Sequence, residues 1–135
     1  MLTPVLALII WTLLVWLWMY ARRLPAMQAA KIAPQEAKHP GTYADRMPSG
    51  ARAVADNYNH LHEQPTLFYA LAFYTHLAGN GDGLAVALAW GYVALRIAHS
   101  LVQNTINLVV ARFVLFSLGT FVLMALAAKN VLAFL

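Results

Sequence analysis

The chain has 135 residues, of which 61% are hydrophobic and only 10% are charged, and it contains no cysteine. A water-soluble domain carries about 25% charged residues, so this composition excludes a surface that faces water throughout. The formal net charge is +4, but no basic–aromatic patch or nucleic-acid-binding motif accompanies it, and we expect no nucleic-acid partner. Without cysteine, disulfides and a cysteine nucleophile are excluded, so any thiol chemistry must use a thiol carried by the substrate.

Four apolar runs approach the length of about 20 residues that crosses the hydrocarbon of a bilayer. They predict transmembrane helices at about residues 4–23, 51–78, 83–103 and 106–134. Helices are expected because lipid cannot satisfy exposed backbone groups. The predicted fold class is an all-α integral membrane protein, a four-transmembrane-helix bundle in one domain over residues 1–135. Arg22 and Arg23 follow the first run and no positive charge precedes it, which favours a retained helix over a signal peptide.

The segment from 24 to 49 is expected to be a loop on the cytoplasmic side. Six of the nine Lys and Arg residues lie between Arg22 and Arg52, which places this connection in the cytoplasm and both termini on the opposite side. The segment contains four prolines, which exclude one long helix, and a loop of this length is either a lid or a disordered linker. At the other end of the bundle, Asp82 is expected to cap the third helix, and Lys129 to snorkel to the headgroups.

Polar residues form a stripe on each of the two middle helices, when residues are placed at 100° intervals. The stripe on the second helix is Arg52, Asp56, Asn59, Glu63, Thr66, Ala70 and Tyr74, and the stripe on the third is Tyr92, Arg96, His99 and Gln103. Glu63 and His99 are equally distant in sequence from Gly81, in the turn between the helices. We therefore expect the two stripes to face each other, with Glu63 in contact with Arg96 or His99.

Two interpretations of these stripes remain open. A charge near the middle of the bilayer costs at least about 2.5 kcal/mol on insertion scales and more often marks a functional site, so the stripes predict a pocket. Alternatively, these groups only satisfy one another and hold the helices in register. A metal site is not expected, because His60 and His62 point to different faces of a helix. Small residues on another face of the third helix, Ala87, Gly91, Ala94 and Ala98, favour close packing against a neighbouring helix.

Two segments carry a resemblance to a known family. "NYNHLHEQPTLFYALAF" (57–73) places polar residues and then Glu-x-Pro before an apolar run, and "RIAHSLVQNTIN" (96–107) places Arg-x-x-His after a Trp-containing span. With four helices, a long first loop and this chain length, the sequence resembles the MAPEG family, the membrane-associated proteins of eicosanoid and glutathione metabolism. The resemblance covers essentially the whole chain and is to a bacterial-type member.

The resemblance implies a homotrimer in the bacterial inner membrane that binds glutathione as a co-substrate between subunits, near the cytoplasmic side. It implies a transferase or peroxidase acting on lipophilic small molecules, the electrophiles of the reaction. By position, the residues expected to bind glutathione are Arg52, Asn59, His60, Glu63, Tyr92, Arg96, His99 and Gln103, and those expected to be catalytic are Arg96 and Arg112. Arginines bind carboxylates in a bidentate manner, and positive charge stabilises a thiolate.

Two departures from the family pattern favour a different function. Leu108 stands where catalytic members have an arginine at the start of the fourth helix, and Ala55 and Asp56 stand where many members have an arginine in the second. Arg112, one turn further on, either replaces the missing arginine or snorkels to the interface. The alternative function is therefore a non-catalytic lipid-binding or scaffolding protein of the same fold. A proton-coupled exporter is not expected, because the first helix has no carboxylate.

Overall fold

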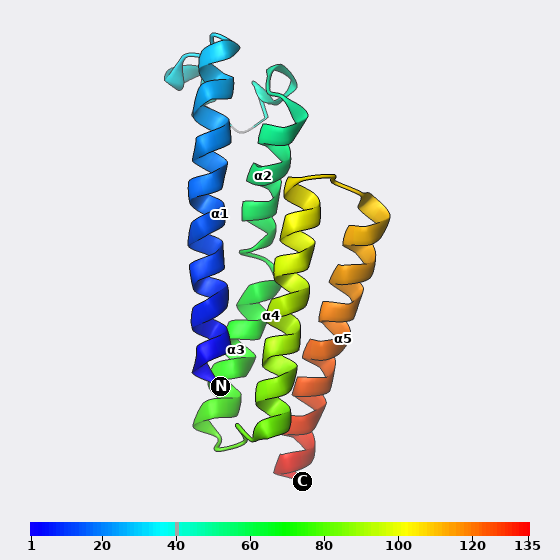
Figure 1. The fold of residues 1–135 in the computed structure, drawn as a ribbon. Helices are drawn as coiled ribbons and strands as arrows, with labels where there is room; N and C mark the ends of the chain where they lie inside the picture. Colours follow the sequence, from blue (N-terminus) through cyan, green and yellow to red (C-terminus); the bar gives the residue numbers. More distant parts are fainter. Residues whose placement is uncertain (40) are drawn as a thin grey trace.

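The computed structural model describes residues 1–39 and 41–135, and over these residues it is built from helices and their connections. Its elements are α1 (Leu2–Ala29), η1 (Pro34–Lys38), η2 (Ala44–Arg46), α2 (Ser49–His60), α3 (Gln64–Leu77), α4 (Gly83–Asn104) and α5 (Val109–Phe134). The helices α2 and α3 continue in one direction, so the five α-helices make four antiparallel passes, and the two termini lie at the same end (Figure 1). The prediction of an all-α four-pass bundle is confirmed.

Helices α1, α4 and α5 are each long and apolar enough to cross a membrane. Their outward faces carry large apolar side chains, among them Leu13, Val110 and Leu132, which are 60%, 77% and 71% exposed. The buried core lies where α1, α2, α3 and α4 meet, around Leu8 and Phe68. An apolar exterior of this extent is stable only in lipid, because burying apolar surface is worth about 25 cal/mol per Å².

The second pass is not one helix, and the prediction of a continuous helix over 51–78 is wrong. α2 ends at His60 and α3 begins at Gln64, with Pro65 in its first turn. A proline lacks the backbone N–H, and its ring clashes with the carbonyl four residues earlier, here that of Leu61. The break is closed locally: the His62 amide donates to the Asn59 carbonyl at 2.9 Å and the Thr66 hydroxyl to the Glu63 carbonyl at 2.6 Å.

The first helix is longer than expected, so a loop beginning at residue 24 is also wrong. Pro25 lies inside α1, which continues to Ala29. The lost hydrogen bond is tolerated because Pro25 follows the arginine pair at the polar end of the span, where a free carbonyl can reach water. The helix ends with Lys31 at φ 54°, and the Ile32 amide donates to the Met27 carbonyl at 3.0 Å, the closing bond of a Schellman motif.

The connection between α1 and α2 folds as a cap on this end of the bundle. Ile32, Met47 and Ala51 form a small buried cluster. Arg46 Nη1 forms an ion pair with Glu36 Oε2 at 3.0 Å. These contacts distinguish residues 30–39 and 41–48 from the disordered-linker alternative, while Pro40 lies outside the described residues.

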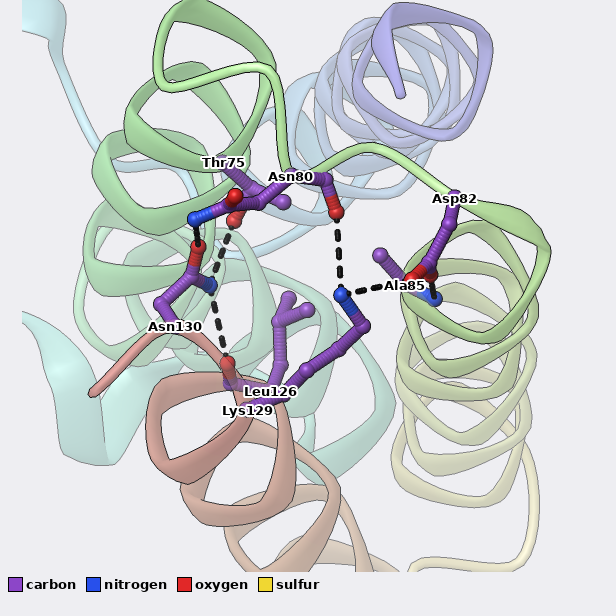
Figure 2. A network of polar contacts seen from close by, with 7 residues as sticks. All are labelled: Thr75, Asn80, Asp82, Ala85, Leu126, Lys129 and Asn130. Carbon is purple, nitrogen blue, oxygen red and sulfur yellow. Dashed lines mark hydrogen bonds and ion pairs between the residues drawn. The ribbon is translucent and has the colours of Figure 1, made fainter. Parts of the chain in front are cut away.

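At the opposite end, Lys129 ties the last turns of α5 to the turn between α3 and α4 (Figure 2). Its Nζ lies 2.9 Å from Asp82 Oδ2 and donates to the Asn80 carbonyl at 3.1 Å. Asp82 Oδ1 accepts from the Ala85 amide at 2.9 Å, which confirms the predicted cap of α4. Lys129 therefore does not snorkel to headgroups as predicted, because the nearby carboxylate and carbonyl offer it partners within the chain.

A buried asparagine completes this network from α5. The Asn130 side chain is 3% exposed; its Nδ2 donates to Thr75 Oγ1 at 2.8 Å, and its Oδ1 accepts from Asn80 Nδ2 at 3.2 Å. Gly79, at φ 73°, makes the turn that presents Asn80 to α5, a backbone conformation that glycine adopts without steric cost. The network joins α3, α4 and α5 at the end of the bundle that holds the two chain termini. It does not reach the opposite end, where α4 connects to α5.

The Asp82 carboxylate gives this network a pH dependence. The backbone N–H of Ala85 and then the Lys129 ammonium lower the pKa of Asp82 below its ordinary value. A carboxyl whose pKa is lower in the folded than in the unfolded protein contributes stability above the unfolded pKa, and this contribution is lost as the pH falls through the folded value, below about pH 4. We predict that acid lowers the Tm of the wild type in detergent more than that of Asp82→Asn. Equal acid sensitivity of the two proteins would contradict this role.

Candidate functional site

The polar stripe of α4 is buried, and the predicted stripe of the second pass is not its partner. Tyr92, Arg96, His99 and Gln103 are all at most 4% exposed. The residues expected to face them, Arg52, Asp56, Asn59, Glu63, Thr66, Ala70 and Tyr74, are all exposed. The expectation that these two stripes face each other is wrong, because a helical projection identifies which residues share a face but not which neighbour that face meets.

A different set of polar residues joins the second pass to α4. His60 Nδ1 lies 3.3 Å from Gln103 Oε1, and Ser100 Oγ donates to Asn57 Oδ1 at 3.1 Å. Directly after the helix break, the side chain of Gln64 accepts from the Tyr92 hydroxyl at 3.3 Å and donates to Thr120 Oγ1 on α5 at 2.7 Å. Asn57, His60 and Gln64 are spaced by three and four residues, so their periodicity was a signal for this seam.

A cavity of about 310 Å³ lies beside this seam. It is bounded by the break between α2 and α3, by α4, and by the first half of α5. Its lining residues are His60, Glu63, Arg96, His99, Val109, Arg112, Phe113 and Phe116. Ligand pockets are usually about 300–1,000 Å³, so this cavity is at the small end of that range.

Arg96 is the buried cation of this cavity, and most of its hydrogen-bonding capacity is unused. The residue is 4% exposed, and its Nη1 lies 3.3 Å from His99 Nδ1. An arginine only donates, so His99 accepts through Nδ1. The buried Nε and Nη2 of Arg96 have no hydrogen-bond partner among the described residues. Because buried polar groups are nearly always paired, two unpaired donors on a buried cation are unusual and make Arg96 a candidate contact for an anion.

Arg112 supplies a second positive charge from α5. Its Nη1 donates to Asn107 Oδ1 at 2.7 Å, and its buried Nε has no partner among the described residues. Asn107 stands at φ 50° between α4 and α5, so this short connection holds Arg112 against the cavity. Leu108, the residue before α5, is 56% exposed and is not in the lining.

Glu63 shares the cavity with Arg96, but the predicted contact between them is absent. The ion pairs within residues 1–39 and 41–135 are Arg46–Glu36 and Lys129–Asp82. Glu63 is the residue before α3 and is exposed, and it lines the same cavity as Arg96 and His99 without forming an ion pair with Arg96. The predicted direct contact of Glu63 with Arg96 or His99 is therefore wrong, although the three residues line one cavity, and this cavity carries more positive than negative charge.

The other predicted site residues fall into two groups. Tyr92 and Gln103 do not line the cavity but pack beside it. The Tyr92 ring stacks on Phe68 with centroids 4.7 Å apart, and Gln103 contacts the lining residue His60. Arg52 and Asn59 line a separate cavity between α1 and α2. Within the described residues, no group of three His, Asp or Glu side chains is placed to hold a metal ion.

The site and the fold together define a class of protein: a small four-pass membrane protein with a cationic cavity between its helices. The model of the MAPEG family matches residues 1–132. The chain therefore belongs to the MAPEG family, which associates it with the membrane proteins of glutathione and eicosanoid metabolism. Among curated proteins and among solved structures, none matches the chain.

Ser100 provides a test of the seam that positions this cavity. Its hydroxyl donates to Asn57, whose side chain is fully buried and whose Nδ2 already has no partner among the described residues. Replacing Ser100 by Ala leaves the Asn57 amide without its hydrogen bond, which costs about 1 kcal/mol within a membrane. We predict a lower Tm in detergent for Ser100→Ala than for the control Ser117→Ala on α5. An unchanged Tm would show that the seam contributes little to stability.

Proposed function

We propose that the chain is a glutathione-dependent transferase or peroxidase that acts on lipophilic electrophiles, with glutathione bound in the cavity around Arg96. The observation that carries the proposal is the buried Arg96 guanidinium, whose Nε and Nη2 have no partner among the described residues. Family membership supports glutathione as the ligand class. Arg96, Arg112, His60 and His99 would hold it, because they line the cavity.

The donors of the cavity suit the chemistry of glutathione. This tripeptide carries two carboxylates, which guanidinium groups bind with paired hydrogen bonds. It also carries an amino group, from which the Glu63 carboxylate can accept a hydrogen bond. Glutathione also supplies the thiol that the chain lacks. Arg52 and Asn59 are left out of the proposed site because they line the other cavity.

The role proposed for the arginines is to favour the thiolate form of the ligand. A cation close to a thiol lowers its pKa, and the thiolate is the reactive nucleophile. At bilayer depth the surroundings are poor in water, so the interaction of Arg96 and Arg112 with an anion is stronger than it would be in solution. His60, which contacts Gln103 and lines the cavity, is the group proposed to accept a proton.

The apolar wall of the cavity supports a lipophilic second substrate. Val109, Phe113 and Phe116 come from α5 and are 71%, 68% and 43% exposed. Since α5 faces the hydrocarbon, a molecule dissolved in the bilayer can reach the cationic end of the cavity without crossing water. The substrate class inferred from this wall is an apolar electrophile.

A homotrimer in a bacterial inner membrane, with the α1–α2 connection in the cytoplasm, is part of the proposal. Two exposed faces support an assembly. One is the polar stripe on α2 and α3 that includes Asn59 and Glu63, which hydrocarbon would disfavour by several kcal/mol. The other is the small-residue stripe of α4, where Ala87 and Ala94 are exposed and would allow close approach of a second helix.

Replacing Arg96 tests the proposed ligand directly. We predict that Arg96→Leu weakens glutathione binding, measured by calorimetry in detergent, by at least about tenfold, because a hydrogen bond to a charged group contributes about 1.5–3 kcal/mol. Arg96→Lys keeps the charge but loses the paired donors, so its affinity for glutathione should lie between those of the wild type and Arg96→Leu. Native mass spectrometry should show three chains in each protein. Unchanged binding in Arg96→Leu would refute the proposed site, and loss of the assembly would show that Arg96 is structural.

The second candidate function is a lipid-binding or scaffolding protein with the same fold, and the observation that favours it is Leu108. If an arginine at position 108 were required for catalysis, the natural chain would be inactive. The position of Arg112 in the cavity argues against that requirement.

The two candidates are separated by one pair of substitutions. If Arg112 supplies the needed charge, Arg112→Leu should reduce turnover of glutathione with an apolar electrophile by about tenfold or more, since one hydrogen bond to a charged group is lost. Leu108→Arg should then change turnover less than about twofold, because Leu108 is outside the cavity. Turnover that appears only in Leu108→Arg would favour the non-catalytic candidate.

A further inference from the structure

Two histidines face the cavity around Arg96, and their ring nitrogens are held in different ways. His60, the last residue of α2, and His99 on α4 both line the cavity, and their ring centroids are 6.5 Å apart. His99 Nδ1 lies 3.3 Å from Arg96 Nη1, and His60 Nδ1 lies 3.3 Å from Gln103 Oε1. The partner of each Nδ1 atom decides which nitrogen carries the proton of the neutral ring.

The partner of His60 leaves the other nitrogen of its ring free to accept a proton. An amide oxygen only accepts hydrogen bonds, so His60 Nδ1 donates to Gln103 Oε1 and carries the proton of the neutral ring. The lone pair is then on Nε2, the nitrogen that Gln103 does not engage. Gln103 is 2% exposed, so water does not compete for this hydrogen bond.

His99 is held in the opposite tautomer. The Arg96 guanidinium only donates, so His99 Nδ1 accepts and the proton of the neutral ring is on Nε2. To take up a further proton, His99 would have to give up its bond to Arg96 and carry a positive charge directly beside the guanidinium, which repels it. Of the two histidines, His60 is therefore the one prepared to accept a proton.

The charges of the cavity favour a proton acceptor when glutathione is bound as a thiolate. The titratable and charged groups that face His60 are Glu63 on its own pass, Arg96 and His99 on α4, and Arg112 on α5; of the described residues, none from α1 lines the cavity. With both histidines neutral, two arginines and one carboxylate leave one net positive charge. Glutathione with an ionised thiol brings two net negative charges, from two carboxylates, one thiolate and one ammonium. The complex would keep one net negative charge, which is costly within a membrane, whereas a proton on His60 makes it neutral.

We propose that the proton of the glutathione thiol stays inside the cavity, on Nε2 of His60, and that Gln103 is the positioning residue that prepares this nitrogen. The inference rests on the proposed function. In this step the S–H bond breaks, its electron pair remains on sulfur, and the proton forms an N–H bond with His60, so no proton enters the solvent. When the thiolate attacks an electrophile, the imidazolium returns this proton to the anion that forms.

The number of protons exchanged on binding tests the proposal without any substitution. The wild type is titrated calorimetrically with glutathione in detergent at neutral pH, in phosphate and in Tris, two buffers of different ionisation enthalpy, and thiolate formation is followed by ultraviolet absorbance. S-methylglutathione has no thiol proton, so the difference between the two ligands isolates that proton. We expect a thiolate band and no net release of the thiol proton to the buffer. One proton released for each thiolate formed would overturn the inference and leave the proposed function standing.

Substitution of His60 should change this proton count. His60→Gln lacks the acceptor, so it should release about one proton per bound thiolate, and its affinity for glutathione should rise about tenfold for each unit of pH above neutral, whereas that of the wild type stays constant. Gln103→Leu should release a fraction of a proton, because the His60 ring is then free to place its own proton on Nε2. The matched control is His76→Gln, since His76 is exposed in the last turn of α3, and it should behave as the wild type does.

Three outcomes with the variants or the wild type would overturn the proposal. Proton release in His99→Gln but not in His60→Gln would assign the proton to the other histidine. Full retention of the proton in Gln103→Leu would show that Gln103 does not set the tautomer. Failure of the wild type to bind glutathione would overturn the proposed function and this inference together. If His60→Gln does not bind glutathione, the proton count of the wild type decides alone.

Discussion

The buried guanidinium of Arg96 is the constraint on which the rest of the site depends. A permanent charge within a transmembrane helix must be paired, hydrated or bound to a ligand, and Arg96 is 4% exposed with one hydrogen-bond contact, to His99. The chain offers it no carboxylate partner within the described residues. The charge is therefore retained at a cost in stability, and the second arginine at the same cavity makes a structural explanation weaker and an anion-binding one stronger.

The broken second pass serves the same arrangement. A continuous helix would satisfy its own backbone and would present one straight face to α4. Pro65 interrupts the helix beside the cavity, so that Gln64 reaches both α4 and α5 while Glu63 turns toward the cavity mouth. The opposite end of the bundle is fixed by Lys129 and Asn130 (Figure 2). One end is thus closed by a polar network of the chain itself, and the end that holds the arginines keeps polar groups unsatisfied.

The sequence predicted the four passes, because apolar runs of span length have few other structures available to them. It also identified the buried stripe of Arg96, His99 and Gln103, since the spacing of charged and amide side chains is unusual in a span. The sequence did not predict which residues of the second pass contact that stripe. The second pass has two polar faces, and the exposed one, with Arg52 and Glu63, carries more charge than the one with Asn57, His60 and Gln64 that meets α4. Charge content indicates which residues need a partner, but tertiary packing decides where the partner comes from.

The same limit explains why the predicted glutathione site separates into two cavities. Arg52 and Arg96 are both cations on adjacent helices, and sequence spacing cannot show that they open on different sides of α2. The positions of Arg23, Lys38 and Tyr43 around Arg52 depend on a fold of the α1–α2 connection that its proline content did not reveal. Where prolines exclude a helix, contacts such as Arg46–Glu36 still define a structure.

The most direct test of the central claim is the ultraviolet difference spectrum of glutathione bound to the detergent-purified protein at neutral pH. If Arg96 and Arg112 stabilise an anion in the cavity, bound glutathione should show thiolate absorbance, and S-methylglutathione, which has no ionisable thiol, should not. Binding of glutathione without a thiolate band would contradict the account, because the cavity would then hold the ligand without activating it.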